Sequence, residues 1–181
     1  MRCYILIDKL MFIAHPDDES IFGGASLLRE QGWKVICLTN GNNSIRSKEF
    51  HKAMEMVGAS YEIWDYPDIY GGSFDVQLVG EDLRKIISRY RSSRIVTHNL
   101  CGEYGHDQHK SLSRILHDQG LDNLYVFDTS NDSIPFHLLQ KKLKLLSIYK
   151  SQMHVIEKLM PYIVYEKIVQ YDQSTCFTEE N

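Results

Sequence analysis

Short apolar runs alternate with segments of helical periodicity along most of this chain. The runs end in loops rich in Gly, Pro, Asn or Asp, and the segments between them repeat apolar residues every three or four positions. This β-α-β-α order predicts an α/β fold with a mostly parallel sheet flanked by helices. Strands are expected at residues 10–14, 33–39, 61–65, 94–97 and 124–127, and helices at about 20–32, 44–58 and 76–90.

The composition fits one domain with a sizeable core. The chain has 181 residues, of which 43% are hydrophobic and 24% charged, and two full domains would be cramped in that length. We expect a single domain over residues 1–171 and a polar, frayed tail at 172–181. The net charge of -4 argues against an extended phosphate-binding surface, so nucleic acid is not an expected partner.

The cysteines and the N-terminus favour a cytoplasmic protein. The N-terminus lacks the apolar region and the cleavage site of a signal peptide, and no window approaches the ~18 apolar residues of a membrane span. The four cysteines are scattered without a C-x-x-C pair, which argues against a disulfide framework or a cysteine-rich metal site. We expect all four to be reduced: Cys3, Cys37, Cys101 and Cys176.

Both ends of the chain carry further expectations. Residues 2–8 are apolar enough for an edge strand or for the start of the first strand, and the sequence leaves these two open. Residues 138–160 are expected to form one long helix or two, ended by Pro161, with a last strand at 162–165. A solvated basic face is the preferred interpretation of the lysines there: Lys141, Lys142, Lys144, Lys150 and Lys158.

The first apolar run leads directly into the segment His15-Pro16-Asp17-Asp18-Glu19-Ser20. Because Pro16 lacks a backbone donor and cannot continue a central strand, the polar residues fall at the strand's carboxyl end, where open α/β sheets bind ligands. An imidazole and three carboxylates there need a partner, and a divalent cation is the simplest one. Alternatively, Asp18 or Ser20 only caps the following helix, with Glu19 in its first turn.

A second polar stretch, residues 98–109, follows the fourth predicted strand and holds three of the eight histidines. Helical spacing resumes at Leu112, so His106 and His109 are expected to share one face of the first turn of a helix. Because both polar stretches follow strands of one sheet, they can face each other across one crevice. Two histidines and one aspartate leave a coordination position for water, as in catalytic zinc sites, and a nearby carboxylate would take that water's proton.

These residues resemble the motifs of the PIG-L/LmbE family of zinc-dependent N-acetylglucosaminyl deacetylases. Ala-His-Pro-Asp-Asp-Glu at 14–19 matches the first family motif without a substitution, and Gly-His-x-x-His at 105–109 matches the second. Weaker matches lie at 39–41, 46–49 and 149–152. The resemblance covers most of the chain and implies a Rossmann-like α/β domain without a dinucleotide fingerprint; no G-x-G-x-x-G occurs in the sequence.

The resemblance also implies the reaction and the residues that perform it. A water activated by the metal would attack an acetamide carbonyl, releasing acetate and a free amine. Spacing alone does not say which aspartate does what; the family motif makes His15, Asp18 and His109 the zinc ligands and Asp17 the general base. His106 would stabilise the oxyanion or protonate the leaving amine.

Substrate contacts follow from the same resemblance. Arg46 and Tyr104 would bind the substrate, and Asp68 would support the ligands from behind. The implied substrate is an N-acetylated amino sugar linked to a small molecule, nucleotide, lipid or glycan. Zinc is the implied metal, with iron(II) as an alternative, and homo-oligomers are compatible with the sequence.

The second motif departs from the common family pattern at two positions. Asp107 stands where Pro is frequent and Gln108 where Asp is frequent. A carboxylate beside His106 would favour its protonated form more than a neutral amide does, so the departure concerns the charge of His106 rather than the metal site. Two alternatives to the deacetylase remain, a non-haem iron(II) oxygenase with the same ligand set and a non-catalytic metal- or sugar-binding module.

Overall fold

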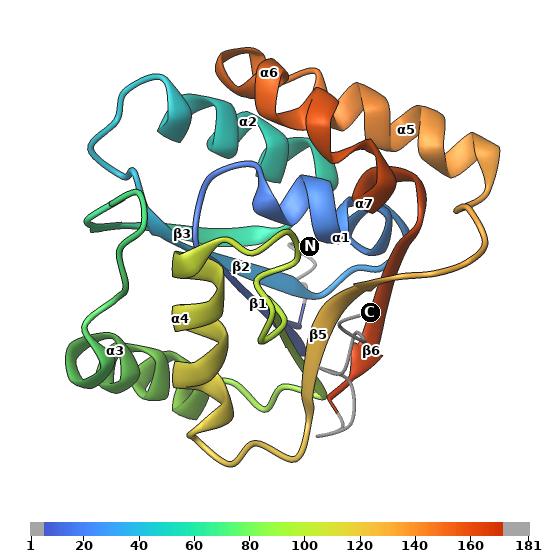
Figure 1. Ribbon diagram of the computed structural model, residues 1–181. Coiled ribbons are helices and arrows are strands. Elements are labelled where there is room, and N and C mark those ends of the chain that lie inside the picture. Colours follow the sequence, from blue (N-terminus) through green and yellow to red (C-terminus); the bar gives the residue numbers. More distant parts are fainter. Residues whose placement is uncertain (1–5, 172–181) are drawn as a thin grey trace, which may run out of the picture.

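The computed structural model describes residues 6–171, which form one sheet with helices on both of its faces (Figure 1). The six strands lie in the order β3-β2-β1-β4-β5-β6; the first five run parallel, and β6 pairs antiparallel with β5. The predicted Rossmann-like α/β fold is therefore confirmed. The strands are β1 (Lys9–Ile13), β2 (Trp33–Thr39), β3 (Ser60–Tyr66), β4 (Arg94–Thr97), β5 (Leu124–Thr129) and β6 (Glu166–Gln170).

Alternate residues of the central strands contact helices on opposite sides of the sheet. Met11 and Ile13 of β1 face the layer that contains α1, α2 and α5, whereas Leu10 and Phe12 face α3 and α4. Strands covered on both faces are apolar almost throughout, which explains why β1 and β2 read as continuous apolar runs. The helices are α1 (Asp18–Arg29), α2 (Arg46–Val57), α3 (Val76–Arg89), α4 (Asp107–His117), α5 (Phe136–Leu146), α6 (Met153–Ile156) and α7 (Met160–Val164).

The strand order reverses at β1, which lies between β2 and β4. The chain runs from β1 outward to β2 and β3, and then crosses back to β4 and β5 on the other side of β1. At such a switch point the connections after the two adjacent strands leave in opposite directions and open a crevice at the carboxyl ends. The segments after β1 and β4 are the two histidine-containing motifs.

The C-terminal third differs from its sequence-based prediction. The expected long helix ends at Leu146, and residues 150–164 form short helical turns, η1 (Lys150–Gln152), α6, η2 (Glu157–Leu159) and α7. Pro161 lies in the first turn of α7 rather than ending a helix, a position where its missing N–H costs nothing. The predicted strand at 162–165 is wrong, because that apolar run packs Ile163 into the core as part of α7, and the last strand begins at Glu166.

Lys142 corrects the interpretation of the C-terminal lysines as a solvated basic face. Its ammonium is buried and lies 2.6 Å from Glu166, and it also donates to the carbonyls of Ile21 and Ile163. Glu166 in turn accepts hydrogen bonds from the N–H groups of Ala25 and Ser26 in α1. A Cβ atom at Gly24 would lie 3.2 Å from the Lys142 side chain, so this glycine gives the lysine room against α1.

The structure tests only part of what was expected for the two ends of the chain and for its cysteines. β1 begins at Lys9 and residues 6–8 precede it, so the described part of the predicted 2–8 strand is not a strand. The frayed tail, Cys3 and Cys176 lie outside the described residues. Cys37 is a buried thiol in β2.

Within residues 6–171, none of the helices combines the length and the apolar character needed to cross a bilayer.

The buried ion pair yields a stability prediction. Glu166→Gln leaves the Lys142 ammonium buried without a counter-charge, and we expect it to lower the free energy of unfolding by about 3–5 kcal/mol. Lys141→Gln, on the exposed side of the same helix, should change the free energy of unfolding by less than about 0.5 kcal/mol. Urea denaturation followed by circular dichroism measures both, and equal midpoints for the two variants would contradict the assignment.

Candidate metal centre

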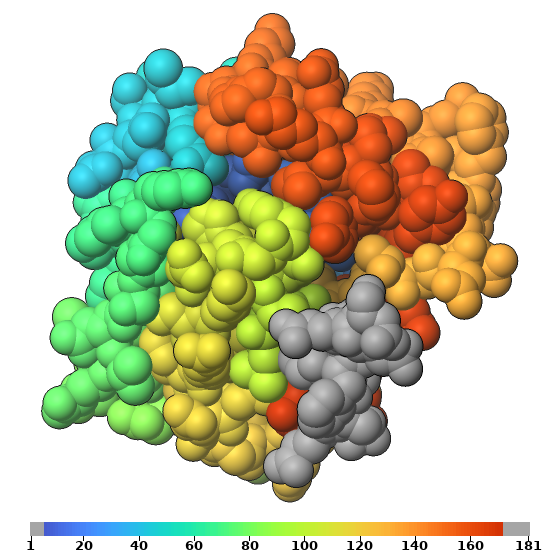
Figure 2. All heavy atoms as spheres, viewed as in Figure 1, coloured from blue at the N-terminus to red at the C-terminus, as the bar shows by residue number. Residues whose placement is uncertain are grey.

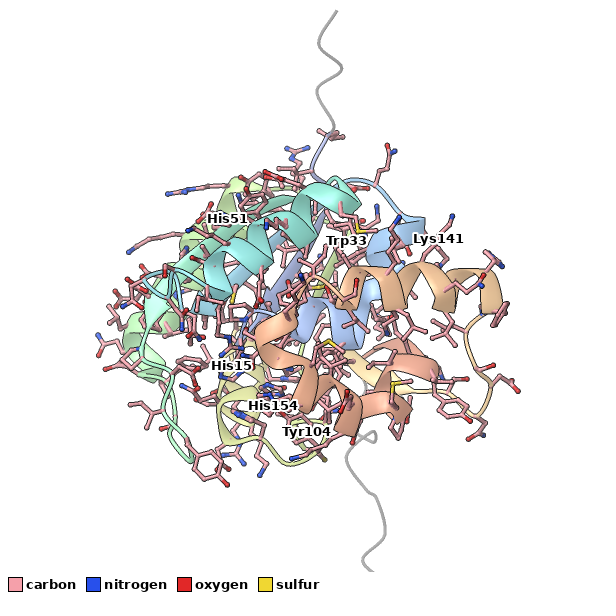
Figure 3. The ribbon with its side chains drawn as sticks, turned by 90° about the horizontal axis from the view of Figure 1, so that it is seen from above. His15, Trp33, His51, Tyr104, Lys141 and His154 are labelled. Atoms are coloured by element: carbon pink, nitrogen blue, oxygen red, sulfur yellow. The ribbon has the colours of Figure 1, made fainter. Side chains whose placement is uncertain are left out.

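The two histidine-containing motifs meet at the switch point of the sheet. His15 follows β1, and His98 and His109 come from the segment after β4 and from α4. The ring centroids of His15 and His109 lie 5.4 Å apart although 94 residues separate them in the chain. In Figure 3, His15, Tyr104 and His154 lie together on one side of the molecule, away from Trp33 at the amino end of β2. The predicted convergence is therefore present.

Three potential ligand atoms form a nearly equilateral triangle. Asp18 Oδ2 lies 3.3 Å from His15 Nδ1 and 3.3 Å from His109 Nε2, and the two nitrogens are 3.4 Å apart. In tetrahedral zinc sites, ligands about 2.0–2.1 Å from the ion lie about 3.3–3.4 Å from one another. All three side chains are buried. The donor set and its spacing therefore fit a zinc ion, and these are the three residues predicted as ligands.

The electrostatics of the triangle call for a positive charge at its centre. Burial alone would lower the pKa of His15, yet the carboxylates of Asp18 and Asp68 raise it to about 10. Burial alone would raise the pKa of Asp18, yet His109, His15 and His98 hold it well below its usual range. Facing lone pairs at this distance repel unless a proton or a metal ion lies between them. A divalent cation satisfies this demand with all three ligands at once.

Two further histidines lie close enough to be considered as ligands, because His98 groups with Asp18 and His109, and His106 groups with His15 and His109. His98 Nε2 accepts a hydrogen bond from the Ala14 N–H at 3.1 Å, so its lone pair is already used. His106 is only half-buried, and its ring stacks on His109 with centroids 4.4 Å apart. The hydrogen bond from Ala14 thus sets His98 apart from the predicted ligands, whereas His106 stays within reach of His15 and His109.

His106 stands one residue outside the helix that was predicted to carry it. It is the N-cap residue of α4, which begins at Asp107. Its Nδ1 atom is buried and has no hydrogen-bond partner within residues 6–171. Burial and the neighbouring imidazoles lower the pKa of His106 to about 4. The ring is therefore neutral at pH 7.

Gln108 contacts the candidate ligand His15 rather than His106. Its Oε1 lies 2.9 Å from His15 Nε2, and its Nε2 donates to the Pro67 carbonyl at 2.8 Å. The amide is therefore held with its oxygen toward His15, which places a proton on Nε2 of that ring and leaves Nδ1 to face Asp18. The expectation that residue 108 acts on the charge of His106 is thus replaced by an orienting contact with His15.

Asp17 occupies a strained position at the start of α1. It is the N-cap residue with φ 117°, a region that non-glycine residues rarely adopt, and its side chain makes no capping hydrogen bond. Its N–H donates to Glu19 Oε2, and Asp18 accepts from the His15 N–H at 2.7 Å. The alternative in which Asp18 or Ser20 merely caps the helix is therefore wrong.

The carboxyl group of Asp17 lies close to both a carboxylate and a guanidinium. It is buried, and burial together with the adjacent Asp18 carboxylate raises the pKa of Asp17 well above its usual range, while Arg46 opposes this shift. The Arg46 guanidinium lies 3.6 Å from Asp17 Oδ1 and donates to the Pro16 carbonyl. A buried carboxylate with a raised pKa is a stronger base than an exposed one.

Arg46 and Asp68 complete one wall of the site. Asp68 Oδ2 lies 3.3 Å from Arg46 Nη1 and accepts from Asn40, and Asp68 Oδ1 lies 3.4 Å from His15 Nε2. The hydrogen bond with His15 lowers the pKa of Asp68 below its usual range. Asp68 thus contacts His15, a candidate ligand, and its supporting role stays a prediction.

A pocket of about 130 Å³ opens onto these residues. Figure 2 shows the hollow between the yellow-green loop after β4 and the orange segment around α6, with blue atoms from the N-terminal part of the chain at its base. Its lining includes polar side chains, Arg46, Asp68 and Gln152, and apolar ones, Ile21, Val155 and Leu159. Tyr104 also lines the pocket and is partly exposed, as a substrate-binding residue would be. A larger groove, on the far side of α4, contains none of the candidate ligands.

The contacts between the C-terminal segment and the first motif were not predicted from the sequence. The Tyr149 hydroxyl donates to Glu19 at 2.5 Å, and the N–H and hydroxyl of Ser151 both donate to Glu49. These contacts hold the segment that carries Gln152, Val155 and Leu159 over the first motif. The weak family match at 149–152 marked this segment without indicating its role.

The comparisons with known proteins agree with this geometry. The family model "PIG-L: GlcNAc-PI de-N-acetylase" matches residues 10–119. A relative, "Uncharacterized protein L374" of Acanthamoeba polyphaga mimivirus, is 40% identical over 177 residues, with 88% of this chain and 78% of that protein covered.

Solved structures share the fold at lower identity. The N,N'-diacetylchitobiose deacetylase from Pyrococcus horikoshii superposes with a TM-score of 0.66 at 19% identity, covering 87% of this chain and 75% of that one. The 4-carboxy-2-hydroxymuconate hydratase GalB from Pseudomonas putida KT2440 reaches 0.61 at 17% identity, covering 84% and 83%. The fold thus hosts more than one reaction, but the family match rests on the sequence itself, and this chain belongs to the PIG-L family.

Proposed function

We propose that this protein is a metal-dependent hydrolase that removes the N-acetyl group from an N-acetylglucosamine-type amino-sugar conjugate. The observation that carries the proposal is the triangle of His15 Nδ1, Asp18 Oδ2 and His109 Nε2, with the Asp17 carboxyl group beside it. The family description, a GlcNAc-PI de-N-acetylase, and the deacetylase among the structural neighbours support the reaction class.

The chain's residues divide the work around a bound ion. His15, Asp18 and His109 would hold zinc, or iron(II) as an alternative, and the bound ion would lower the pKa of a water to about 7 and would supply positive charge for the developing oxyanion. Asp17 takes a proton from the attacking water. The same proton then passes from Asp17 to the leaving nitrogen, so the products are acetate and a free amine.

His106 acts on the other side of the reacting carbonyl. Because its pKa is lowered to about 4, the ring is neutral at pH 7. A neutral imidazole still donates an N–H hydrogen bond, which favours the role of oxyanion stabiliser over that of proton donor. The proton for the amine comes from Asp17 in this scheme.

The pocket lining suits both parts of an acetylated sugar. Arg46, Asp68 and Gln152 offer hydrogen-bond groups for ring hydroxyls, and Tyr104 offers a ring face. Ile21, Val155 and Leu159 add apolar side chains to the same lining, and these suit a methyl group.

Two other functions use the same ligand set, an iron(II) oxygenase and a non-catalytic binding module. Asp17 argues against both, since neither needs a buried carboxyl group in a strained backbone conformation beside the ligands. Acetate release from N-acetylglucosamine conjugates under anaerobic conditions supports the hydrolase. Turnover that depends on oxygen, or tight metal and sugar binding without turnover, would overturn it.

Asp17→Asn tests the general base. The amide keeps the size of the side chain and cannot accept the proton, so we expect acetate release to fall by about 10²–10⁴-fold while metal content stays unchanged. Asp132→Asn is the control and should keep full activity, because Asp132 is exposed on a loop and does not line the pocket. If Asp17→Asn turns over at the wild-type rate, the base assignment fails.

His109→Ala tests the metal site without reference to activity. Removing one of three protein ligands leaves two, which should lower the metal affinity by at least about tenfold. The variant purified without chelators is therefore expected to hold less than a tenth of the wild-type metal. His137→Ala, an exposed histidine on α5, should keep the wild-type content. Elemental analysis of both gives the answer, and full metal occupancy in His109→Ala would exclude the proposed ligand set.

A further inference from the structure

The Glu103 side chain lies buried between two histidines of the site. Its Oε2 atom is 2.7 Å from His109 Nδ1 and 3.0 Å from His98 Nδ1. Its other oxygen accepts a hydrogen bond from the Asn99 N–H at 2.9 Å. Only 1% of the side chain is exposed, so these three hydrogen-bond partners take the place of water around the carboxylate.

The loop around Glu103 is shaped to hold this carboxylate in place. Glu103 has φ 56°, a left-handed conformation that glutamate rarely adopts. Its N–H donates to Asn99 Oδ1, and its carbonyl accepts from the Tyr162 hydroxyl of α7. A strained backbone persists only where its surroundings determine it, and here five hydrogen-bonding contacts of one residue do so.

The carboxylate decides which nitrogen of His109 carries the proton. An ionised carboxylate only accepts hydrogen bonds, so the Nδ1 atom of each ring that contacts it must be the protonated one. For His109 this leaves the lone pair on Nε2, the atom that faces Asp18 and His15. For His98 it leaves the lone pair on Nε2 as well, which accepts the Ala14 N–H.

His98 ties the carboxylate to the first motif. The contacts form a continuous chain from the Ala14 N–H through His98 to Glu103 and on to His109. The His98 and His109 rings stack with centroids 3.7 Å apart and planes 17° from parallel. His109 is thereby fixed against the backbone of the residue that directly precedes His15.

We propose that Glu103 is the positioning residue of the metal centre, which holds the proton on Nδ1 of His109 and so presents Nε2 to the ion, with His98 as its anchor. This inference rests on the metal site of the proposed function but not on the reaction. It also gives His98, which is among the residues able to ligate, a role outside the ligand set.

Glu103→Gln is the sharpest substitution because it changes charge and not shape. The amide must turn its NH₂ group either toward the two ring N–H groups or toward the Asn99 N–H, so one donor meets another in either orientation. We expect the variant's zinc dissociation constant, measured by competition with a chromophoric chelator, to rise by about 10–100-fold. Glu157→Gln, an exposed residue of η2, should bind zinc as the wild type does.

A second measurement uses the wild-type protein, so the inference stays testable if Glu103→Gln does not fold. Long-range ¹H–¹⁵N spectra of the zinc-loaded protein, with His109 identified by its loss in His109→Asn, should show the proton on Nδ1 and the metal on Nε2. A proton on Nε2 of His109 would overturn the inference. So would a folded Glu103→Gln variant with wild-type zinc affinity, because a purely structural role would lower only the melting temperature.

The outcomes also separate this inference from the proposed function. Zinc binding that is weakened by Glu103→Gln, in a protein that releases no acetate from any N-acetylated sugar, would uphold the positioning role and overturn the deacetylase. Zinc binding that is equal in both proteins, together with acetate release, would do the reverse. A wild-type protein that takes up no zinc and no iron(II) would overturn both.

Discussion

The site depends on one carboxylate, Asp18, which is buried among imidazole nitrogens. Its Oδ2 atom lies within 3.4 Å of His15, His98 and His109. Burying a charge costs far more than burying an apolar group unless an opposite charge comes with it, so this arrangement persists only with protons or a metal ion among the lone pairs. The three nitrogens are not equivalent, because the Ala14 N–H donates to His98 Nε2, whereas His15 Nδ1 and His109 Nε2 remain as the proposed ligand atoms.

The remaining fold supplies the two strands, the turns and the cover that this cluster needs. The switch point brings the ends of β1 and β4 together, and Pro16 lies in the turn between the end of β1 at Ile13 and the start of α1 at Asp18. From the other end of the chain, Tyr149 and Ser151 bind glutamates of α1 and α2. The buried Lys142–Glu166 pair joins α1 to α5 and β6. The C-terminal third therefore packs against the helix that follows the first motif (Figure 1).

Sequence patterns predicted the parts of this molecule that depend on local chemistry. Five strands and three helices follow from periodicity because buried parallel strands are apolar throughout and their helices are amphipathic. Motif position predicted only that the two histidine-containing segments would meet after two strands of one sheet, and the choice of His15, Asp18 and His109 came from the family resemblance. The structure brings these residues together as expected, and it adds Gln108 as a contact of His15 rather than of His106.

Contacts between distant segments could not be predicted in the same way. Nothing in the sequence around Lys142 distinguishes it from a surface lysine. Its burial depends on Glu166, which lies on a strand that the sequence did not indicate. Glu103 lies outside the two family motifs. Its role depends on a left-handed backbone conformation and on two histidines brought close by the fold. The apolar run at 162–165 was predicted as a strand because propensity cannot say whether β-branched residues pack from a strand or from one helical turn.

The central claim is that His15, Asp18 and His109 bind one metal ion. Crystals of the protein loaded with zinc, measured at wavelengths on both sides of the zinc absorption edge, test it most directly. The account predicts one strong anomalous peak per chain, with His15 Nδ1, Asp18 Oδ2 and His109 Nε2 each about 2.0–2.2 Å from it. No peak in the pocket, or a peak bound by His98 or His106 in place of one of these three, would contradict it.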